Sequence, residues 1–554
     1  MKLRFIATLL LLTTILSPAV FADAPDEKIL RVSYSAGNVQ LDPAHSFTTT
    51  EAQLYTAIYE GLVGYHPLTL EPVPAAASRW IISPDGKTYT FFLRADGRYW
   101  NGDHVTAEHF RDSWMRILTP EENAEYSFMF DIIQGARDFR TGETDDPQEV
   151  GIKVISPLIL EIKLNESADY FLKLLCHHSF SPVNPKNLEN GQWKNGPSCV
   201  GNGPFYIMKR RPEQIELRRN LLYWDREHVN IPEIHLIFND DAENTAENFN
   251  SGAVHWAASG IYLAMIENPD NIVTNPLFGT TYFFFNTEGD DPLSIPEVRR
   301  GLSLIIPWEK IRTTSNFFIP SATLVPAIPG YPKVDGITDR DMKQALTLLH
   351  QAGFTKGSGI GPIIIRIPES RDSLYIASLM KQEWEKFLDV EVKIEVSSFD
   401  VYYNKLKEPG YSLGTTTWIG DYADPLTFLQ MWTAGSNLND SGYNDPIYDR
   451  LLEEAIKETP KERYRIMAEA EKRLLYGALV LPIENYPAFN AVNIGVLEGW
   501  YPNVLDIHPF KYLNLIVPKL PDGLVMSDSS GTPALFMPKN DFNSAARLPL
   551  YSQY

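Results

Sequence analysis

The segment from Thr415 to Pro425 carries the residues best suited to recognition chemistry. It reads Thr-Thr-Thr-Trp-Ile-Gly-Asp-Tyr-Ala-Asp-Pro, so a β-rich run delivers Trp418, a glycine, and then Asp421 beside Tyr422. Burying a lone carboxylate among aromatic side chains is costly unless a cation meets it. An incoming ammonium group would be such a cation, and an aromatic neighbour adds cation–π attraction. The pattern therefore fits a capture site for a peptide α-amino group. A helix-capping role for the aspartate fits the same residues equally well.

Signatures of catalysis are missing from the sequence. It contains no HExxH, no GxSxG and no paired-cysteine zinc pattern. Gly86-Lys87-Thr88 lacks the preceding glycine of a phosphate loop. His104 and His109 are five positions apart, a spacing that does not place two side chains on one helix face. Catalytic triads form in space rather than in sequence, so these absences lower the odds of an enzyme without excluding one. We expect a binding protein with no catalytic residues, no metal and no cofactor.

The N-terminus has the parts of a secretory signal peptide. Lys2 and Arg4 precede the apolar run 5–16, and Val20-Phe21-Ala22 offers small residues for cleavage after Ala22. The apolar run is too short to span a membrane. No cysteine lies near the cut, so a lipid anchor is not expected. These features predict a soluble periplasmic protein; the alternative is a buried N-terminal helix.

The amino-acid composition limits the classes of molecule that the protein can bind. The chain has 554 residues and a formal net charge of −21, which becomes −23 once Lys2 and Arg4 leave with the signal peptide. Such an acidic protein repels nucleic acid and anionic lipid head groups, which argues against both as partners. The length predicts two or three domains.

Cys176 and Cys199 are the two cysteines of the chain. In an oxidising compartment they are expected to form one disulfide, which would contribute roughly 3 kcal/mol by closing a loop of about 24 residues. Two unpaired buried thiols are the alternative. The neighbouring His177-His178 pair fits no standard zinc pattern, because adjacent side chains on a strand diverge.

Strands and helices alternate along the chain, which favours an α/β fold. A helix is predicted to open at Thr459-Pro460, with Glu462 completing a capping box. Residues 521–554 lack periodicity and read as a loosely packed extension. The predicted strands cover 29–34, 87–94, 158–164, 205–208, 214–218, 233–238, 281–286, 363–367 and 391–396, and the predicted helices 51–62, 106–118, 241–250, 296–306, 345–352 and 373–388.

Several ordered blocks of the sequence resemble the family 5 extracellular solute-binding proteins. The likeness spans residues 29–519 and, within the family, is greatest to the oligopeptide-binding type of the oligopeptide permease systems. The blocks are the signature stretch 71–118, LDP at 41–43, YEGLVGY at 59–65, VGNGPF at 200–205, LLYWD at 221–225, YFFFN at 282–286 and IGDYADP at 419–425.

The resemblance implies a two-lobed periplasmic binding protein fold of the class II, cluster C type, with three domains, mixed sheets and a hinge crossed twice. It also implies a monomeric receptor that encloses a short peptide and delivers it to an inner-membrane ABC permease with its ATPases. The domains implied are 1–22 signal peptide, 23–65, 186–276 and 488–520 domain I, 66–185 domain II, 277–487 domain III, and 521–554 extension.

Matching motifs then assign the peptide site. Asp421 looks like the acid that pairs with the peptide α-amino group. Pocket aromatics are implied at Trp418 and Phe399, and a tyrosine brought by domain II at Tyr126. The remaining residues implied at the site are Gly37, Asn38 and Val39 for backbone pairing, Gly420 and Tyr422 within the motif, and Tyr486 by a looser match.

The sequence departs from the oligopeptide type where the ligand carboxylate is met. Thr415 and Ser373 stand at the positions of the arginine and histidine of that type. Lys405, Lys407 and Arg371 lie nearby in sequence as substitutes. Ligand length therefore stays open, as does the choice between a free and a cell-wall peptide.

Two other classes share this scaffold. A nickel or haem importer receptor would have the fold without the peptide site, and Asp421 with its aromatic neighbours speaks against it. An enzyme or adhesin on the same fold is the second alternative.

Overall fold

The computed structural model describes residues 28–35, 39–46, 48–189, 192–289, 292–313 and 319–516. The predicted signal peptide, the C-terminal extension, Gly37 and Asn38 lie outside these residues. Within them, the helices are all too short or too polar to cross a lipid bilayer.

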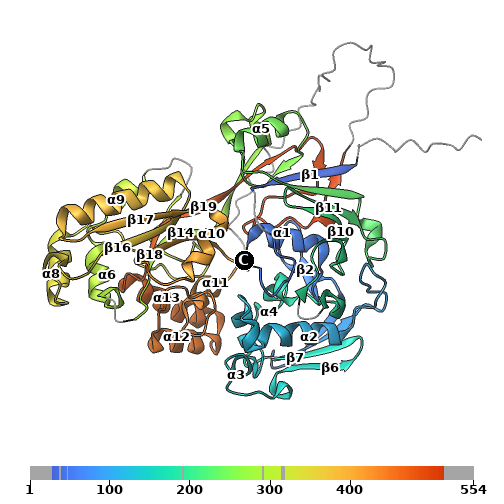
Figure 1. The fold of residues 1–554 in the computed structure, drawn as a ribbon. Coiled ribbons are helices and arrows are strands. Elements are labelled where there is room, and N and C mark those ends of the chain that lie inside the picture. The colour runs from blue at the N-terminus through green and yellow to red at the C-terminus, as the bar shows by residue number, and fades with distance from the viewer. Residues whose placement is uncertain are drawn as a thin grey trace, which may run out of the picture.

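One large mixed sheet runs through the whole molecule (Figure 1). Its parallel and antiparallel pairs include β1 parallel to β12 and β14 antiparallel to β18. In spatial order its strands are β10 (Phe205–Arg211), β11 (Gln214–Arg219), β12 (Glu233–Phe238), β1 (Ile29–Tyr34), β13 (Trp256–Ala257), β19 (Val480–Val492), β14 (Ile272–Phe285), β18 (Leu413–Ile419), β16 (Ile363–Pro368) and β17 (Val392–Ser397), with β15 (Ile319–Pro320) on β19.

A second sheet of four antiparallel strands forms a smaller layer beside the helix α2. Its strand order is β4 (Ala77–Ile82), β5 (Thr88–Leu93), β7 (Ile159–Lys163) and β6 (Ile152–Ser156). Two-stranded ribbons pair β2 (Val63–Tyr65) with β3 (Pro72–Pro74), β8 (Leu188–Glu189) with β9 (Gln192–Trp193) and β20 (Leu497–Glu498) with β21 (Asn514–Leu515).

Helices cover both faces of the large sheet.

We call the part built on β1, β10–β12 and the four-stranded sheet the first lobe, and the part built on β16–β18 the second lobe. The α-helices are α1 (Thr49–Ile58), α2 (Ala107–Leu118), α3 (Ala136–Arg140), α4 (Phe171–Leu174), α5 (Ala242–Asn250), α6 (Pro296–Ser303), α7 (Trp308–Arg312), α8 (Met342–Gln351), α9 (Arg371–Phe387), α10 (Phe399–Leu406), α11 (Leu426–Leu429), α12 (Pro446–Ile456) and α13 (Pro460–Tyr476).

The aromatic run of β14 explains why the second lobe has helices on both sides. Phe283 packs in one core with Trp384 of α9, whereas Tyr282 packs in the opposite core with Met467 of α13. A strand buried on both faces is apolar at every position rather than at alternate ones. Figure 1 shows α9 and α13 on opposite sides of the sheet.

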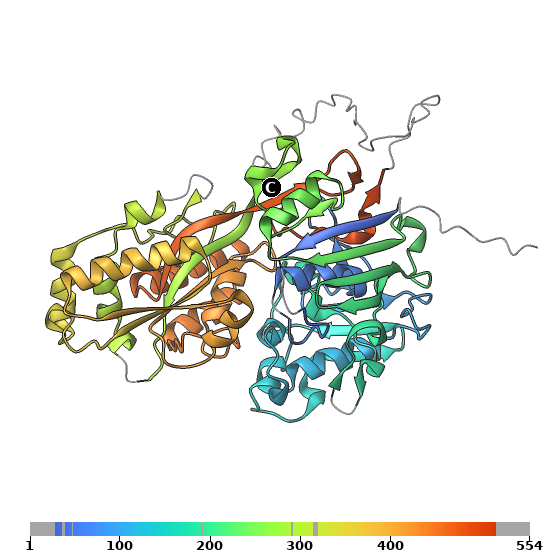
Figure 2. The same cartoon turned by 45° about the horizontal axis from the view of Figure 1, so that its top comes forward.

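Two long strands connect the lobes. Figure 2 shows β14 and β19 passing together from one lobe to the other. Their pairing register is interrupted between Pro276 and Thr280, opposite Pro487 and Asn485. Prolines and bulges remove hydrogen bonds between paired strands, so bending β14 and β19 costs the least free energy at this point. Two strands thus cross between the lobes, as the resemblance implied, while the domain boundaries themselves stay predictions.

Local signals in the sequence predicted most elements, but the predicted helix 51–62 ends at Ile58. Helix α5 begins after Asp241, whose carboxylate accepts from the backbone N–H groups of Glu243 and Asn244. Helix α13 does begin at Pro460, but the Thr459 side chain makes no capping hydrogen bond. Glu462 pairs with Arg465 instead, so the predicted capping box is wrong.

The predicted disulfide is also wrong. Cys176 and Cys199 are both unpaired thiols. Cys199 is buried in the core of the first lobe with Tyr59, while Cys176 packs at the edge of a different hydrophobic core. The Sγ atom of Cys199 contacts the Tyr59 hydroxyl at 3.3 Å, and the Sγ atom of Cys176 contacts the Leu172 carbonyl at 3.5 Å. The presence of two cysteines in the sequence does not show that they lie in different hydrophobic cores.

We therefore expect thiol titration of the mature protein, denatured without reductant, to detect two thiols per chain. Because burial raises the pKa of Cys199 to about 11 and also raises that of Cys176, both should react slowly while the protein is folded. A titration that detects no thiol after denaturation would show that the pair is oxidised.

Candidate functional site

Asp421 lies where the second lobe meets the first. Strand β18 ends at Ile419, and Gly420 continues the ladder by donating its N–H to the Phe278 carbonyl at 2.7 Å. A Cβ on Gly420 would lie 2.5 Å from Phe278 and 2.8 Å from Thr427. Glycine is thus the residue that lets the chain pass between these two side chains and turn Asp421 toward the first lobe.

Thr427 fixes the orientation of Asp421. Its hydroxyl accepts from the Asp421 N–H at 3.0 Å and donates to Oδ2 of the carboxylate at 3.1 Å. Its carbonyl accepts from Trp418 Nε1 at 3.0 Å. One residue of α11 therefore holds both the predicted amine anchor and the predicted pocket tryptophan. Thr427 was not predicted from the sequence, because its distance of six residues from Asp421 matches no standard capping pattern.

The first lobe supplies the rest of the surroundings of Asp421. The Tyr65 hydroxyl donates to the Asp421 carbonyl at 3.2 Å, and His177 Nε2 lies 3.6 Å from Oδ1. Tyr126, the tyrosine predicted from domain II, also interacts with the carboxyl group. Its ring packs edge-on against His177 with centroids 4.5 Å apart. The structure thus brings together Asp421, Trp418 and Tyr126, and adds His177 and Tyr65.

The Asp421 carboxyl group has no fixed cation. Its side chain is 9% exposed, and no lysine or arginine of the described chain forms an ion pair with it. Burial raises its pKa to about 7, although its interactions with Thr427 and Tyr126 act in the opposite direction. A group in this setting is stabilised most by a positive charge delivered from outside.

The second acid of the motif is arranged differently. Asp424 and Arg463 form a bidentate ion pair at 2.6 and 2.7 Å, with side chains 5% and 6% exposed. Oδ1 of Asp424 also accepts from the Leu426 N–H at the start of α11. Asp424 therefore has its cation within the protein and supports the loop, whereas Asp421 has none.

Contacts between the lobes surround the site. Lys407 pairs with Glu125 at 3.3 Å, and the Asn437 amide donates to the Ala124 carbonyl at 2.7 Å. Tyr422 stacks on Tyr170 of the first lobe, with centroids 6.0 Å apart and planes 7° apart. The structure is therefore a closed arrangement of the two lobes.

The other predicted site residues are less closely tied to Asp421. Phe399 begins α10 with 59% of its surface exposed and packs edge-on against Tyr403. Tyr486 lies on β19 beside Phe489. Val39 is buried in the first lobe, and its carbonyl accepts from Arg210 at 2.5 Å.

The residues at the positions of the missing basic groups have structural contacts. Thr415 is buried and donates to the Tyr282 carbonyl at 3.0 Å, which joins β18 to β14. Ser373 lies in the first turn of α9, where its N–H donates to the N-cap Ser370. Neither supplies a cation.

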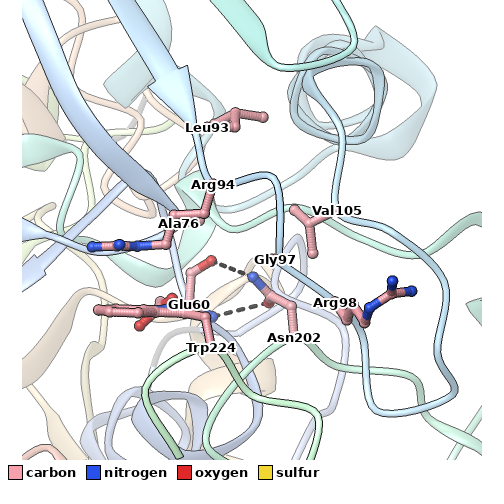
Figure 3. Close-up of a pocket in the computed structure, with 9 residues that line it drawn as sticks. All are labelled: Glu60, Ala76, Leu93, Arg94, Gly97, Arg98, Val105, Asn202 and Trp224. Atoms are coloured by element: carbon pink, nitrogen blue, oxygen red, sulfur yellow. Dashed lines mark hydrogen bonds between the residues drawn. The ribbon is translucent and has the colours of Figure 1, made fainter.

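Two cavities within the described part of the chain lie away from Asp421. Figure 3 shows one of about 10 Å³ behind Glu60, where the Asn202 side chain bonds both backbone groups of Glu60. This volume holds about one water molecule. A second cavity of about 320 Å³ lies between residues 166–170 and 456–460 of the two lobes.

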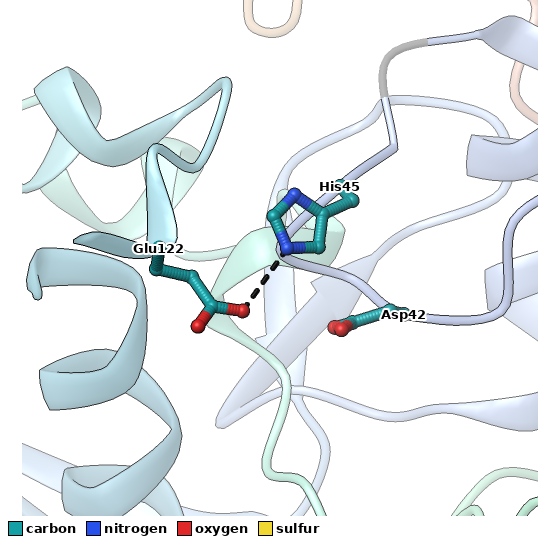
Figure 4. A group of neighbouring side chains, drawn as sticks. All are labelled: Asp42, His45 and Glu122. Atoms are coloured by element: carbon teal, nitrogen blue, oxygen red, sulfur yellow. Dashed lines mark hydrogen bonds and ion pairs between the residues drawn. The ribbon is translucent and has the colours of Figure 1, made fainter. Parts of the chain in front are cut away.

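A cluster of possible metal ligands lies elsewhere on the first lobe. Asp42, His45 and Glu122 place their ligand atoms within 4.8 Å of one another (Figure 4). Arg116, however, pairs with both Asp42 and Glu122. Its guanidinium group already compensates these carboxylates, so the cluster is an ion-pair network rather than a metal site.

The sequence of the chain is similar to those of known solute-binding proteins. The sequence profile of the bacterial extracellular solute-binding proteins, family 5, matches residues 71–440. The oligopeptide-binding protein OppA of Bacillus subtilis is 28% identical over 486 residues, covering 84% of this chain and 88% of that protein. The periplasmic murein peptide-binding protein MppA of Escherichia coli is 28% identical over 465 residues, covering 80% and 85%.

Solved structures share the fold and report on its conformation. A structure of Escherichia coli MppA superposes with a TM-score of 0.80 at 25% identity, covering 89% of this chain and 99% of that one. The unliganded open form of MppA gives 0.61 at 26% identity, covering 89% and 98%. Since the two structures are of one protein, the lower score reflects the lobe arrangement. The present structure is thus further from the open form.

Two lobes that close around a buried, uncompensated carboxylate define a receptor that encloses its ligand. The chain belongs to the family 5 bacterial extracellular solute-binding proteins. Its fold is the two-lobed, three-domain periplasmic binding protein fold that the resemblance implied.

Proposed function

We propose that this protein captures short peptides between its lobes and delivers them to an ABC peptide importer. One observation carries the proposal: Asp421 is buried at the lobe interface with no lysine or arginine of the described chain to neutralise it. The α-amino group present on every free peptide supplies that charge. The relatives support this ligand class, since their names describe oligopeptide, dipeptide and murein peptide binding.

The finer parts of the proposal follow from the sequence. Cleavage after Ala22 releases a monomeric chain into the periplasm, where it acts as a binding protein and not as an enzyme. Its partners are short peptides and an inner-membrane permease with its ATPases. The ligand contacts Asp421, Trp418, Tyr126 and Tyr422, with Gly420 shaping the turn. Phe399, Tyr486 and the backbone of residues 37–39 line the remainder of the cleft.

Closure explains how an importer reads the loaded state. Tyr65, Tyr126 and His177 belong to the first lobe, whereas Asp421 and Trp418 belong to the second. A peptide held by both groups favours the closed state over the open one. The permease then distinguishes loaded from empty receptor by shape.

The ligand class can be tested by thermal unfolding after co-purified ligand has been removed by denaturation and refolding. A ligand that binds only the folded state raises the unfolding temperature. We expect di-, tri- and tetrapeptides to raise it, and haem and nickel–histidine chelates to leave it unchanged. If only haem or the nickel chelate raised the unfolding temperature, the protein would be a nickel or haem importer receptor rather than a peptide receptor. Peptide cleavage detected by mass spectrometry would favour the enzyme.

Peptide affinity should depend on pH in a defined direction. The ligand-free Asp421 carboxyl group holds its proton up to about pH 7, whereas the ammonium-bound form is ionised. Binding below pH 7 therefore releases a proton, and affinity should fall by up to about tenfold per pH unit as the pH decreases. Above about pH 8 the peptide amine itself loses its charge and affinity should fall again.

Calorimetric titrations between pH 5 and pH 9 measure this profile. The same proton stabilises the ligand-free fold at acidic pH, and that contribution is lost as the pH rises through 7. Asp421→Asn removes the titrating group, so its affinity should be flat on the acidic side. An acidic limb that persists in this variant would assign the proton to another group.

A further inference from the structure

His177 occupies an unusual position beside the amine anchor. It follows α4 in the first lobe, is 6% exposed, and places Nε2 3.6 Å from Asp421 Oδ1 in the second lobe. His178 lies against the other side of its ring, with centroids 3.9 Å apart. The pair His177–Asp421 therefore crosses the lobe interface and forms only when the lobes are closed.

The hydrogen bonds around His177 indicate its tautomer. Nδ1 accepts from the Ser179 backbone N–H at 3.4 Å, so this nitrogen carries no proton. The single ring proton is then on Nε2, which faces the Asp421 carboxylate. Burial, and secondarily the neighbouring His178, lowers the pKa of His177 well below its usual value. His177 is therefore a neutral ring that turns its Nε2–H toward Asp421 Oδ1 across a separation of 3.6 Å.

The groups that face this pair are neutral as well. Burial raises the pKa of Tyr65 and Tyr126 far above the physiological range. Burial also lowers the pKa of His178 to about 3, and its Nε2 contacts the Ser46 hydroxyl at 2.8 Å. No described neighbour of Asp421 therefore competes with a ligand for its negative charge.

Building on the proposed function, we propose that His177 is a positioning residue for amine recognition, which orients the Asp421 carboxylate upon closure without neutralising it. A lysine or arginine at this place would form an internal ion pair, as Arg463 does with Asp424, and would displace the ligand ammonium. A neutral donor avoids this competition. Because donor and acceptor come from different lobes, closure and alignment of the anchor occur together.

Three substitutions separate this role from a purely structural one. H177F keeps a ring but removes the donor, H177Q keeps an N–H donor, and H177K adds a cation. For each, the affinities for a free and an N-acetylated tripeptide are measured between pH 5 and pH 9.

H177F should weaken binding of the free tripeptide by about tenfold, the effect of losing a polar N–H group that faces a charged one. The midpoint of the acidic limb should also rise by about one pH unit, because the anion loses a stabilising donor. H177Q should restore affinity to within about threefold and return the midpoint. H177K should lose about a hundredfold for the free tripeptide and little for the acetylated one.

The inference is overturned if H177F weakens both peptides equally and leaves the midpoint unchanged, since a structural defect acts in that way. If H177F does not fold, the comparison of H177Q with H177K decides: equal affinity of these two for the free tripeptide overturns it. Failure of the unaltered protein to bind any peptide refutes the proposed function instead, so the two failures can be distinguished.

Discussion

Asp421→Asn is expected to lower the affinity for free peptides by about 10²- to 10³-fold, because a buried charge that loses its partner costs about 3–5 kcal/mol. The substitution keeps the shape of the side chain and an acceptor for the Thr427 hydroxyl. It removes only the negative charge that would meet the ligand ammonium. Isothermal titration calorimetry at pH 7.5 with a tripeptide measures the loss.

An N-acetylated tripeptide is the matched control for this variant. It has no ammonium group, so Asp421→Asn should change its already weak binding little. The variant should also unfold at or above the temperature of the unaltered ligand-free protein, since it removes an uncompensated buried carboxyl group. Unchanged affinity for the free tripeptide would exclude Asp421 as the anchor.

Asp424→Asn should instead cause a large loss of stability, whereas Asp421→Asn should lower peptide affinity without destabilising the fold. Arg463 would keep a buried guanidinium group with no carboxylate, and its Nε already has no partner in the described structure. Removing one member of a buried ion pair typically costs about 3–5 kcal/mol. An asparagine can still cap α11 through its side-chain oxygen, so the effect isolates the lost charge. Urea unfolding of the ligand-free protein measures the change in the free energy of unfolding.

The double variant Asp424→Asn/Arg463→Met provides the control. It removes both charges and should recover most of the lost stability, because apolar groups often replace buried ion pairs without net cost. Discrimination between free and acetylated peptides should survive in it. A single Asp424→Asn variant within about 1 kcal/mol of the unaltered protein would contradict the assigned role.

These two variants distinguish acids only three residues apart. Sequence alone treats Asp421 and Asp424 as similar members of IGDYADP. In the structure, Arg463 from α13 reaches Asp424, while the neighbours of Asp421 are Thr427, Tyr126 and His177. The N-cap position of α11 is Pro425, and the acid that bonds the first N–H of this helix is Asp424, not Asp421. The absence of a cation at Asp421 is what makes it the candidate anchor.

Periodicity predicted the regular elements well where a strand or helix carried its own signal. The strand Ile29–Tyr34 and the helix that follows Asp241 have the expected positions. The predicted strand 281–286 is the end of the longer β14, whose first part includes Asn275 and Pro276 and passes between the lobes. Its length comes from pairing with β19, a partner about two hundred residues away that local propensity does not reveal.

The candidate site was predictable only through its motif. Trp418 and Asp421 could be named because they lie in one recognisable segment. Thr427 bonds the Asp421 carboxylate from α11 of the same lobe. Tyr65 and His177 reach the Asp421 carbonyl and carboxylate from the other lobe, so their contacts depend on lobe closure. The cysteine prediction failed because the sequence does not show that Cys176 and Cys199 lie in separate hydrophobic cores.

The central claim is that the buried charge of Asp421 recognises the peptide amine. The most direct measurement is a calorimetric titration of refolded, ligand-free protein with a tripeptide and its N-acetylated form at pH 7.5. We expect tight binding of the free tripeptide and a loss of at least about a hundredfold upon acetylation. Equal affinity for the two forms would contradict the claim.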